Sequence, residues 1–346
     1  MQKIHKQNFS LYALSWIEII GLKIAPDLLG EEMSFELSSQ HIRIRLPTID
    51  VCNIPPKEYG NDEIKCLAYH LEDGKYIPKY FDVLRIRVEI NVLDTPLLPT
   101  DILNVQNNAY EILPPDNQQI LNDISFNYEE MANHAFDAWC RTLRWKSRNG
   151  SIGRANISHT NKAGTSRLYE ANTKKCIWVG GSGRTSSGRF PGGQFITHEV
   201  WENASRALLT FQRPPSYIDL FFDGEDHLKN GYLARSVIDF AIAAEILIRR
   251  NLQVGLPKDI QKKIFDDIVK SNITNIFPKY GPTIFGNKKW EKLKENKVMI
   301  DTIRDLFIKR NQIVHYADSA ELSLDGCEKY RLTVAELINN WVIKHG

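Results

Sequence analysis

Arg310, Asn311 and His315 are the residues whose types and spacing best fit a chemical role. On a helix Asn311 and His315 share a face, with Arg310 beside them. A histidine can exchange a proton near neutral pH, and the planar guanidinium of an arginine matches two phosphate oxygens. Cleavage of RNA by its own 2′-hydroxyl needs a base, an acid for the leaving 5′-oxygen and a cation for the developing charge. The trio therefore predicts a site that cleaves RNA.

An Arg and a His on one helix often serve only as surface or capping groups. Whether this motif has a chemical role therefore depends on the fold around it. The chain after Arg213-Pro214-Pro215 has helical periodicity, and the paired prolines mark a domain boundary. Helices are expected over residues 217–228, 232–252, 257–269, 289–316 and 326–344, with a turn-rich connection at 273–288. Five helices with mostly short loops predict an all-α bundle over residues 214–346.

Two segments of this bundle resemble the HEPN superfamily of helical nucleotide-binding and ribonuclease domains. One is the Ala-rich stretch from Leu228 to Glu245, which is similar to the second helix of the family with its trailing acid. The other is Arg310-Asn311 followed by His315 and a terminal helix, which is similar to the family's Arg, polar residue and His. The resemblance covers about 130 residues, from Tyr217 to the C-terminus.

The resemblance implies that Arg310, Asn311 and His315 are the catalytic positions of an endoribonuclease. It implies a homodimer through the C-terminal domain, in which two copies of the motif form one site. Such a site needs no metal and leaves a 2′,3′-cyclic phosphate and a 5′-hydroxyl. Glu245 is expected either to support Arg310 or His315 or to pair within the bundle. Tyr316 is expected either to stack on a base of the substrate or to pack in the core or the dimer interface. The family also suggests a defence (antiviral) or toxin effector.

The first 213 residues predict a β-rich α+β region. Alternating apolar and polar residues near 42–46 and 81–93 indicate strands with one buried face. A helix is expected from Tyr128 to Arg148, because apolar residues recur at helical spacing and acids occupy its first turn. Further elements are expected as a strand at 167–179, a short strand at 194–200, and a helix or final strand at 201–211. The whole chain is therefore expected to be α+β.

Charge is divided unevenly along this region, although the net charge is only +2. Residues 31–130 hold 18 acidic and 8 basic side chains, whereas residues 141–213 hold 13 basic and 3 acidic side chains. A basic segment of this kind fits a phosphate backbone, and it could equally neutralise the acidic segment within the fold. The candidate substrate-binding residues of this segment are Arg144, Arg148, Arg184 and Arg189.

Several other classes of protein are not indicated. The Gly-rich residues 180–193 lack the Lys-Ser/Thr of a P-loop and the GxGxxG that opens a helix in dinucleotide sites. The five cysteines are scattered without a CxxC pair, and no apolar run is long enough to cross a bilayer. We therefore expect no cofactor, no metal site, no membrane contact and a cytoplasmic location. Six further histidines are isolated in the sequence and are expected to be structural or exposed, namely His41, His70, His134, His159, His198 and His227.

Three readings of the function follow. In the first, the C-terminal domain cleaves RNA while the N-terminal region recognises RNA or a protein or phage-derived trigger. In the second, a non-catalytic HEPN module uses Arg310 and His315 only to bind a nucleotide, RNA or a protein partner. In the third, both regions serve protein interaction in a regulatory subunit.

Overall fold

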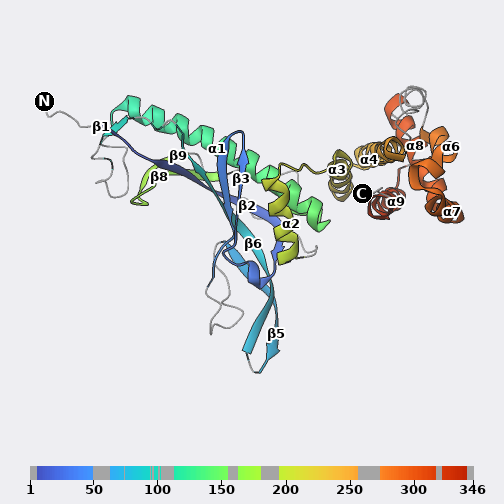
Figure 1. The fold of residues 1–346 in the computed structure, drawn as a ribbon, viewed down its shortest axis with the longest axis horizontal. Coiled ribbons are helices and arrows are strands. Elements are labelled where there is room, and N and C mark those ends of the chain that lie inside the picture. Colours follow the sequence, from blue (N-terminus) through green and yellow to red (C-terminus); the bar gives the residue numbers. More distant parts are fainter. Residues whose placement is uncertain are drawn as a thin grey trace. The chain divides into compact units, whose positions relative to one another are not determined.

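The computed structural model describes residues 6–49, 63–73, 75–93, 95, 97–99, 102, 113–154, 163–180, 195–255, 273–316 and 322–340. The chain divides into two compact units, Met1–Arg213 and Pro214–Gly346. The first is built on an antiparallel sheet with helices and the second is helical, so the expected α+β class is confirmed (Figure 1). Among the described residues, no helix combines the length and the apolar character that a membrane crossing requires.

The first unit has a mixed-length antiparallel sheet in the order β3-β4-β6-β2-β8-β9, with β5 paired to β6. These strands are β2 Leu11–Ile24, β3 Glu32–Leu37, β4 Gln40–Arg45, β5 Ile64–Glu72, β6 Lys75–Asn91, β8 Ala163–Glu170 and β9 Cys176–Gly180. A separate pair joins β1 (Lys6–Asn8) to β7 (Leu97–Pro99), and the 3-10 helix η1 (Pro26–Leu28) follows β2. Beyond the other strands, β5 and the start of β6 continue as a two-stranded ribbon (Figure 1).

The sheet contains two hairpins, of which the second was predicted to be a single strand. Ser38 and Ser39 have φ values of 51° and 65°, which let β3 turn tightly into β4. The strand expected at residues 167–179 is likewise two strands, because Glu170 accepts hydrogen bonds from the backbone of Asn172 and Thr173 and closes a turn. These local hydrogen bonds reverse the chain within the polar residues 170–175, so the expectation of one strand was wrong.

One face of the sheet is covered by α1 (Pro115–Ser147), which contacts β2, β6, β8 and β9 (Figure 1). Its core-facing side chains are Leu121, Ala132, Ala135, Phe136, Trp139 and Leu143. The helix begins well before Tyr128, with Pro115 in its first turn, where a missing N–H costs nothing. Early polar residues hide the period there, so the sequence located only the second half of the helix.

A second helix, α2 (His198–Leu209), packs against α1 and β3. The rings of Trp139 and Trp201 meet edge to face with centroids 6.1 Å apart. Thr197 caps the helix, since its hydroxyl accepts from the backbone N–H of Val200. The short strand expected at residues 194–200 was therefore wrong beyond Ile196, which forms a single bridge to Ile24.

The second unit contains the helices α3 Ser216–Lys229, α4 Leu233–Gly255, α6 Ile273–Phe285, α7 Asn287–Glu295, α8 Lys297–Tyr316 and α9 Leu324–Asn340. The expected boundary between the first two helices is confirmed, since α3 ends at Lys229 and α4 begins at Leu233. Gly231 has φ 79° and follows Lys229 by two residues, and the N–H of Tyr232 donates to the carbonyl of His227 in a helix-ending turn. The helix expected at 257–269 lies outside the described residues.

Two expectations for this unit were wrong. Residues 273–285 form α6 despite Pro278, Gly281 and Pro282, and the helix expected at 289–316 is divided at Asn296. Tertiary packing explains α6, because a Cβ at residue 281 would lie 2.4 Å from the ring of Trp290 on α7. Glycine thus lets the ring pack against the helix. The side chain of Asn296 accepts from the N–H of Met299 and so starts α8.

Replacing Gly224 on α3 by valine should destabilise the second unit by about 1–3 kcal/mol, because the site is filled. A Cβ at this position would lie 2.6 Å from the ring of Phe240, which is fully buried on α4. Urea unfolding followed by circular dichroism would measure the loss. Phe240→Leu in the same chain should return part of the stability, and two independent, additive losses would contradict this packing.

Candidate functional site

The Arg310-Asn311-His315 motif lies at the C-terminal end of α8. This helix buries one side, with Met299, Ile303, Leu306 and Phe307 in the core. It is tied to α9 by a short hydrogen bond from the hydroxyl of Tyr330 to the carboxylate of Asp305. Burial and this bond raise the pKa of Tyr330 well above its usual value, so the phenol stays protonated and keeps donating. The motif therefore belongs to a helix that is anchored along its length.

Arg310 lies on the buried side of α8 and is half-buried. One terminal nitrogen of its guanidinium donates to the side-chain oxygen of Asn311 at 3.0 Å. Its Nε is buried and has no hydrogen-bond partner among the residues that the structure describes. A buried donor without a partner costs free energy unless an acceptor arrives, so this guanidinium is suited to an anion.

His315 lies on the exposed side of the same helix. Five residues at 3.6 per turn place it roughly 140° around the axis from Arg310, whereas Asn311 is only about 40° away. The adjacent Tyr316 is 80% exposed, and its ring meets the imidazole edge to face at 6.4 Å. Within one chain the imidazole and the guanidinium therefore point to different sides, and Asn311 lies between them.

Two alternatives were expected for each of Tyr316 and Glu245, and the surroundings of these side chains bear on them. Tyr316 is too exposed to be a core residue within this chain, so stacking on a ligand and packing in an interface both remain open. The carboxylate of Glu245 accepts from Nε and Nη2 of Arg249 at 2.9 and 2.7 Å, one turn along α4. Its pairing within the bundle agrees with the structural alternative for this acid.

The predicted substrate-binding arginines differ in their placement. Arg144 is 7% exposed, and its guanidinium donates to the backbone carbonyl of Ile152 at 2.6 Å. The expectation that it binds substrate was therefore wrong, because the side chain belongs to the core and fixes the turn after α1. Arg148 is exposed at the end of α1. Arg184 and Arg189 lie outside the described residues.

His227 pairs with an acid in the helical unit, which agrees with the expectation that it is structural. Its Nδ1 lies 2.8 Å from Oδ2 of Asp239, whose side chain is 3% exposed, and Nε of Arg235 lies 3.5 Å from Oδ1. The pair joins the end of α3 to the start of α4. No spacing in the sequence indicated it, because the two residues meet only through the helix-ending turn between them.

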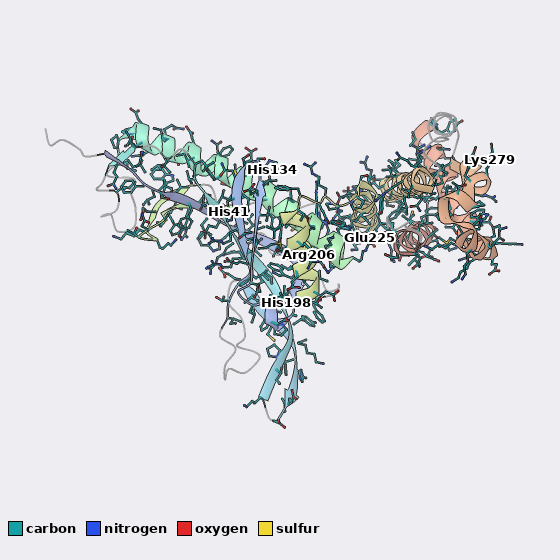
Figure 2. All side chains as sticks on the ribbon, viewed as in Figure 1. His41, His134, His198, Arg206, Glu225 and Lys279 are labelled. Atoms are coloured by element: carbon teal, nitrogen blue, oxygen red, sulfur yellow. The ribbon has the colours of Figure 1, made fainter. Side chains whose placement is uncertain are left out.

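Other histidines occupy separate elements. Figure 2 labels His41 on β4, His134 on α1 and His198 on α2, all exposed. Within the described ranges, no group of three or more His, Cys, Asp or Glu side chains is placed to hold a metal ion. In the helical unit, Glu225 of α3 (Figure 2) pairs with Arg331 of α9 at 3.0 Å and joins those two helices.

Comparisons of the chain with family models, with curated proteins and with solved structures found no match.

Proposed function

We propose that this chain is a HEPN-type endoribonuclease that cleaves RNA without a metal ion, in the role of a defence or toxin effector. The observation that carries the proposal is the end of α8. There an exposed imidazole, an amide and a guanidinium, whose buried Nε has no partner among the described residues, lie within six residues of one helix. These groups are the ones that transesterification of RNA requires.

In the proposed reaction, His315 removes the proton from the 2′-hydroxyl of the substrate. The 2′-oxygen then forms a bond to phosphorus, and the bond from phosphorus to the 5′-oxygen breaks. A proton delivered to that oxygen completes the 5′-hydroxyl, while the other product carries a 2′,3′-cyclic phosphate. Arg310 binds the phosphate oxygens as negative charge grows on them, and Asn311 positions the guanidinium by accepting its hydrogen bond.

A homodimer could bring together an imidazole and a guanidinium that lie on different sides of α8 within one chain. Ile308, Asn311 and His315 follow one another at helical spacing on the exposed side of α8, and Ile308 is 51% exposed. Val314 and Tyr316 add apolar surface at the same end of α8, each at least 50% exposed. Such a surface suits a two-fold pairing of identical patches, which would bring a second His315 and a second Arg310 to one phosphate.

The test is incubation of the purified full chain with RNA in the presence of EDTA, followed by end-group analysis. We expect cleavage that survives chelation and products with 2′,3′-cyclic phosphate and 5′-hydroxyl ends. Products with 3′-hydroxyl and 5′-phosphate ends would contradict the proposed chemistry, as would a wild-type chain that stays inert at high concentration.

The second candidate is a non-catalytic module in which the motif only binds. It is favoured by one observation, namely that Arg310 already donates to Asn311 and lies on a different side of α8 from His315. In this case the wild-type chain should bind RNA or a nucleotide without cutting it. The same incubation, read for both bound and cleaved RNA, separates the two candidates.

A further inference from the structure

The face of the sheet that points away from α1 carries aromatic side chains on its central strands. Successive side chains of β2 alternate between the two faces, and Ala13 and Ile17 belong to the core that α1 and α2 share. Tyr12 and Trp16 therefore point to the other face. Tyr169 of β8 is paired directly with Tyr12, and residues that face each other across an antiparallel pair lie on the same side of the sheet.

These rings are in contact with one another and with two cations. Tyr12 and Tyr169 stack with centroids 5.2 Å apart and ring planes 13° apart. The guanidinium carbon of Arg167 on β8 lies over the indole of Trp16, 4.9 Å from its centroid. The ammonium of Lys174, in the turn between β8 and β9, lies over the ring of Tyr12 at the same distance. We call these five residues the sheet-face cluster.

The acidic side chains of the sheet are neutralised by arginines from their own part of the sequence. The pairs are Arg43 with Glu89 at 3.1 Å, Arg45 with Glu32 at 2.9 Å and Arg87 with Glu63 at 3.0 Å. Arg167 and Lys174 come from the basic segment 141–213 and are exposed, and neither forms an ion pair with a residue that the structure describes. Their charge is therefore available to an anionic ligand.

The turn that presents Lys174 is fixed by a buried carboxylate. Glu170 is 3% exposed, and its side chain accepts from the backbone N–H groups of Asn172 and Thr173. The N–H of Lys174 donates to the carbonyl of Glu170 at 2.9 Å, and Lys174 has a left-handed φ of 57°. A ligand would therefore meet a preformed backbone and lose little affinity to ordering it.

We infer that the sheet-face cluster is a binding site for single-stranded RNA. Antiparallel sheets bind such RNA by stacking about two or three bases on aromatic side chains, and bases also stack on the planes of guanidinium groups. Trp16, Tyr169 and Arg167 supply such surfaces, while the two cations can contact phosphates. The choice of RNA over another polyanion rests on the proposed function, whereas the site itself stands on the contacts within the first unit.

The test uses the full chain with His315→Ala, so that the RNA stays intact, and a fluorescent single-stranded RNA of roughly 20 nucleotides. Anisotropy titrations between about 50 and 200 mM salt would give the affinity and its salt dependence. Arg167→Gln with Lys174→Gln should weaken binding by about tenfold and should reduce the steepness of log K against log salt by about 0.7 per lost phosphate contact.

A matched control is Lys75→Gln with Lys79→Gln, which removes the same charge from exposed positions on the β5–β6 ribbon. It should leave the affinity within about twofold of the parent chain. Equal losses in the two double variants would overturn the site, since they would reflect net charge alone. An unchanged salt slope in Arg167→Gln/Lys174→Gln would overturn it as well, because the two cations would then make no phosphate contact.

Trp16→Leu tests the stacking separately from the charge. It should weaken binding by about 5- to 100-fold, the loss expected for one stacked base, and should leave the salt slope unchanged. Leucine keeps an apolar side chain on β2, and circular dichroism would check that the fold is retained. Normal affinity in a folded Trp16→Leu chain would overturn the stacking. If this variant does not fold, Arg167→Gln/Lys174→Gln decides alone.

These outcomes are separable from the fate of the proposed function. If the wild-type chain fails to cut RNA but the sheet-face variants lose binding as expected, the ribonuclease is rejected and the RNA site stands. If the wild-type chain cuts RNA and the same variants bind normally, the reverse holds. A chain that neither binds nor cuts RNA would reject both.

Discussion

RNA cleavage by the His315→Ala variant should fall by about 10²–10⁴-fold relative to the wild-type chain, because proton transfer by a positioned imidazole contributes an acceleration of this size. The side chain is exposed on α8, and its removal leaves the buried side of the helix untouched. Folding should therefore be unaffected, and surface replacements of this kind change stability by less than about 0.5 kcal/mol. The measurement is the initial rate of cleavage at neutral pH with EDTA present.

The control for this variant is His134→Ala, which removes an exposed imidazole from α1 (Figure 2). It should cleave at the wild-type rate. A His315→Ala chain that retains more than about a tenth of the activity would show that this imidazole does not transfer the proton. Mixing His315→Ala with Arg310→Ala chains offers a further check, since a site shared across a dimer should regain part of its activity when each chain supplies the group that the other lacks.

The Trp139→Ala variant should lose about 3–5 kcal/mol of unfolding free energy, the largest effect on stability that we expect in the first unit. Trp139 is fully buried at the junction of α1, α2 and the sheet, where its ring contacts Phe136 and Trp201. Its loss would leave a cavity that rigid helices and strands cannot close. Urea unfolding followed by circular dichroism would measure the change, since the helical signal survives removal of the indole.

Phe126→Ala on the same helix provides the control for Trp139→Ala. Phe126 is 67% exposed, so its truncation should cost less than about 0.5 kcal/mol. If the two variants were equally stable, the proposed core at the α1–α2 junction would be wrong. Because the chain forms two compact units, we also expect the unfolding of residues 214–346 to be little changed by Trp139→Ala.

Much of the fold was predictable wherever the pattern of side chains matches one regular element. The alternation around Ile42–Arg45 and along β6 indicated strands, and the apolar residues of 217–228 and 232–252 indicated α3 and α4. The clearest failure is in the second unit. Residues 273–285 carry the local signs of a turn, yet they form α6, and Gly281 lets the ring of Trp290 on α7 pack closely against this helix. The local cost in a helix interior is about 1 kcal/mol for Gly and about 3 kcal/mol for Pro, so residues 273–285 are helical against their local preference.

In the candidate site, too, some properties follow from the local sequence and others only from the tertiary structure. The sequence by itself determined that Arg310, Asn311 and His315 occur together on one helix, since residue type and spacing are local properties. Only the tertiary structure decided that Arg310 is on the buried side and His315 on the exposed side, because burial depends on which face of α8 packs against the bundle. It also placed Arg144 in the core and brought His227 beside Asp239 across the turn between α3 and α4. Those relations join residues that the sequence keeps apart, and no local pattern encodes them.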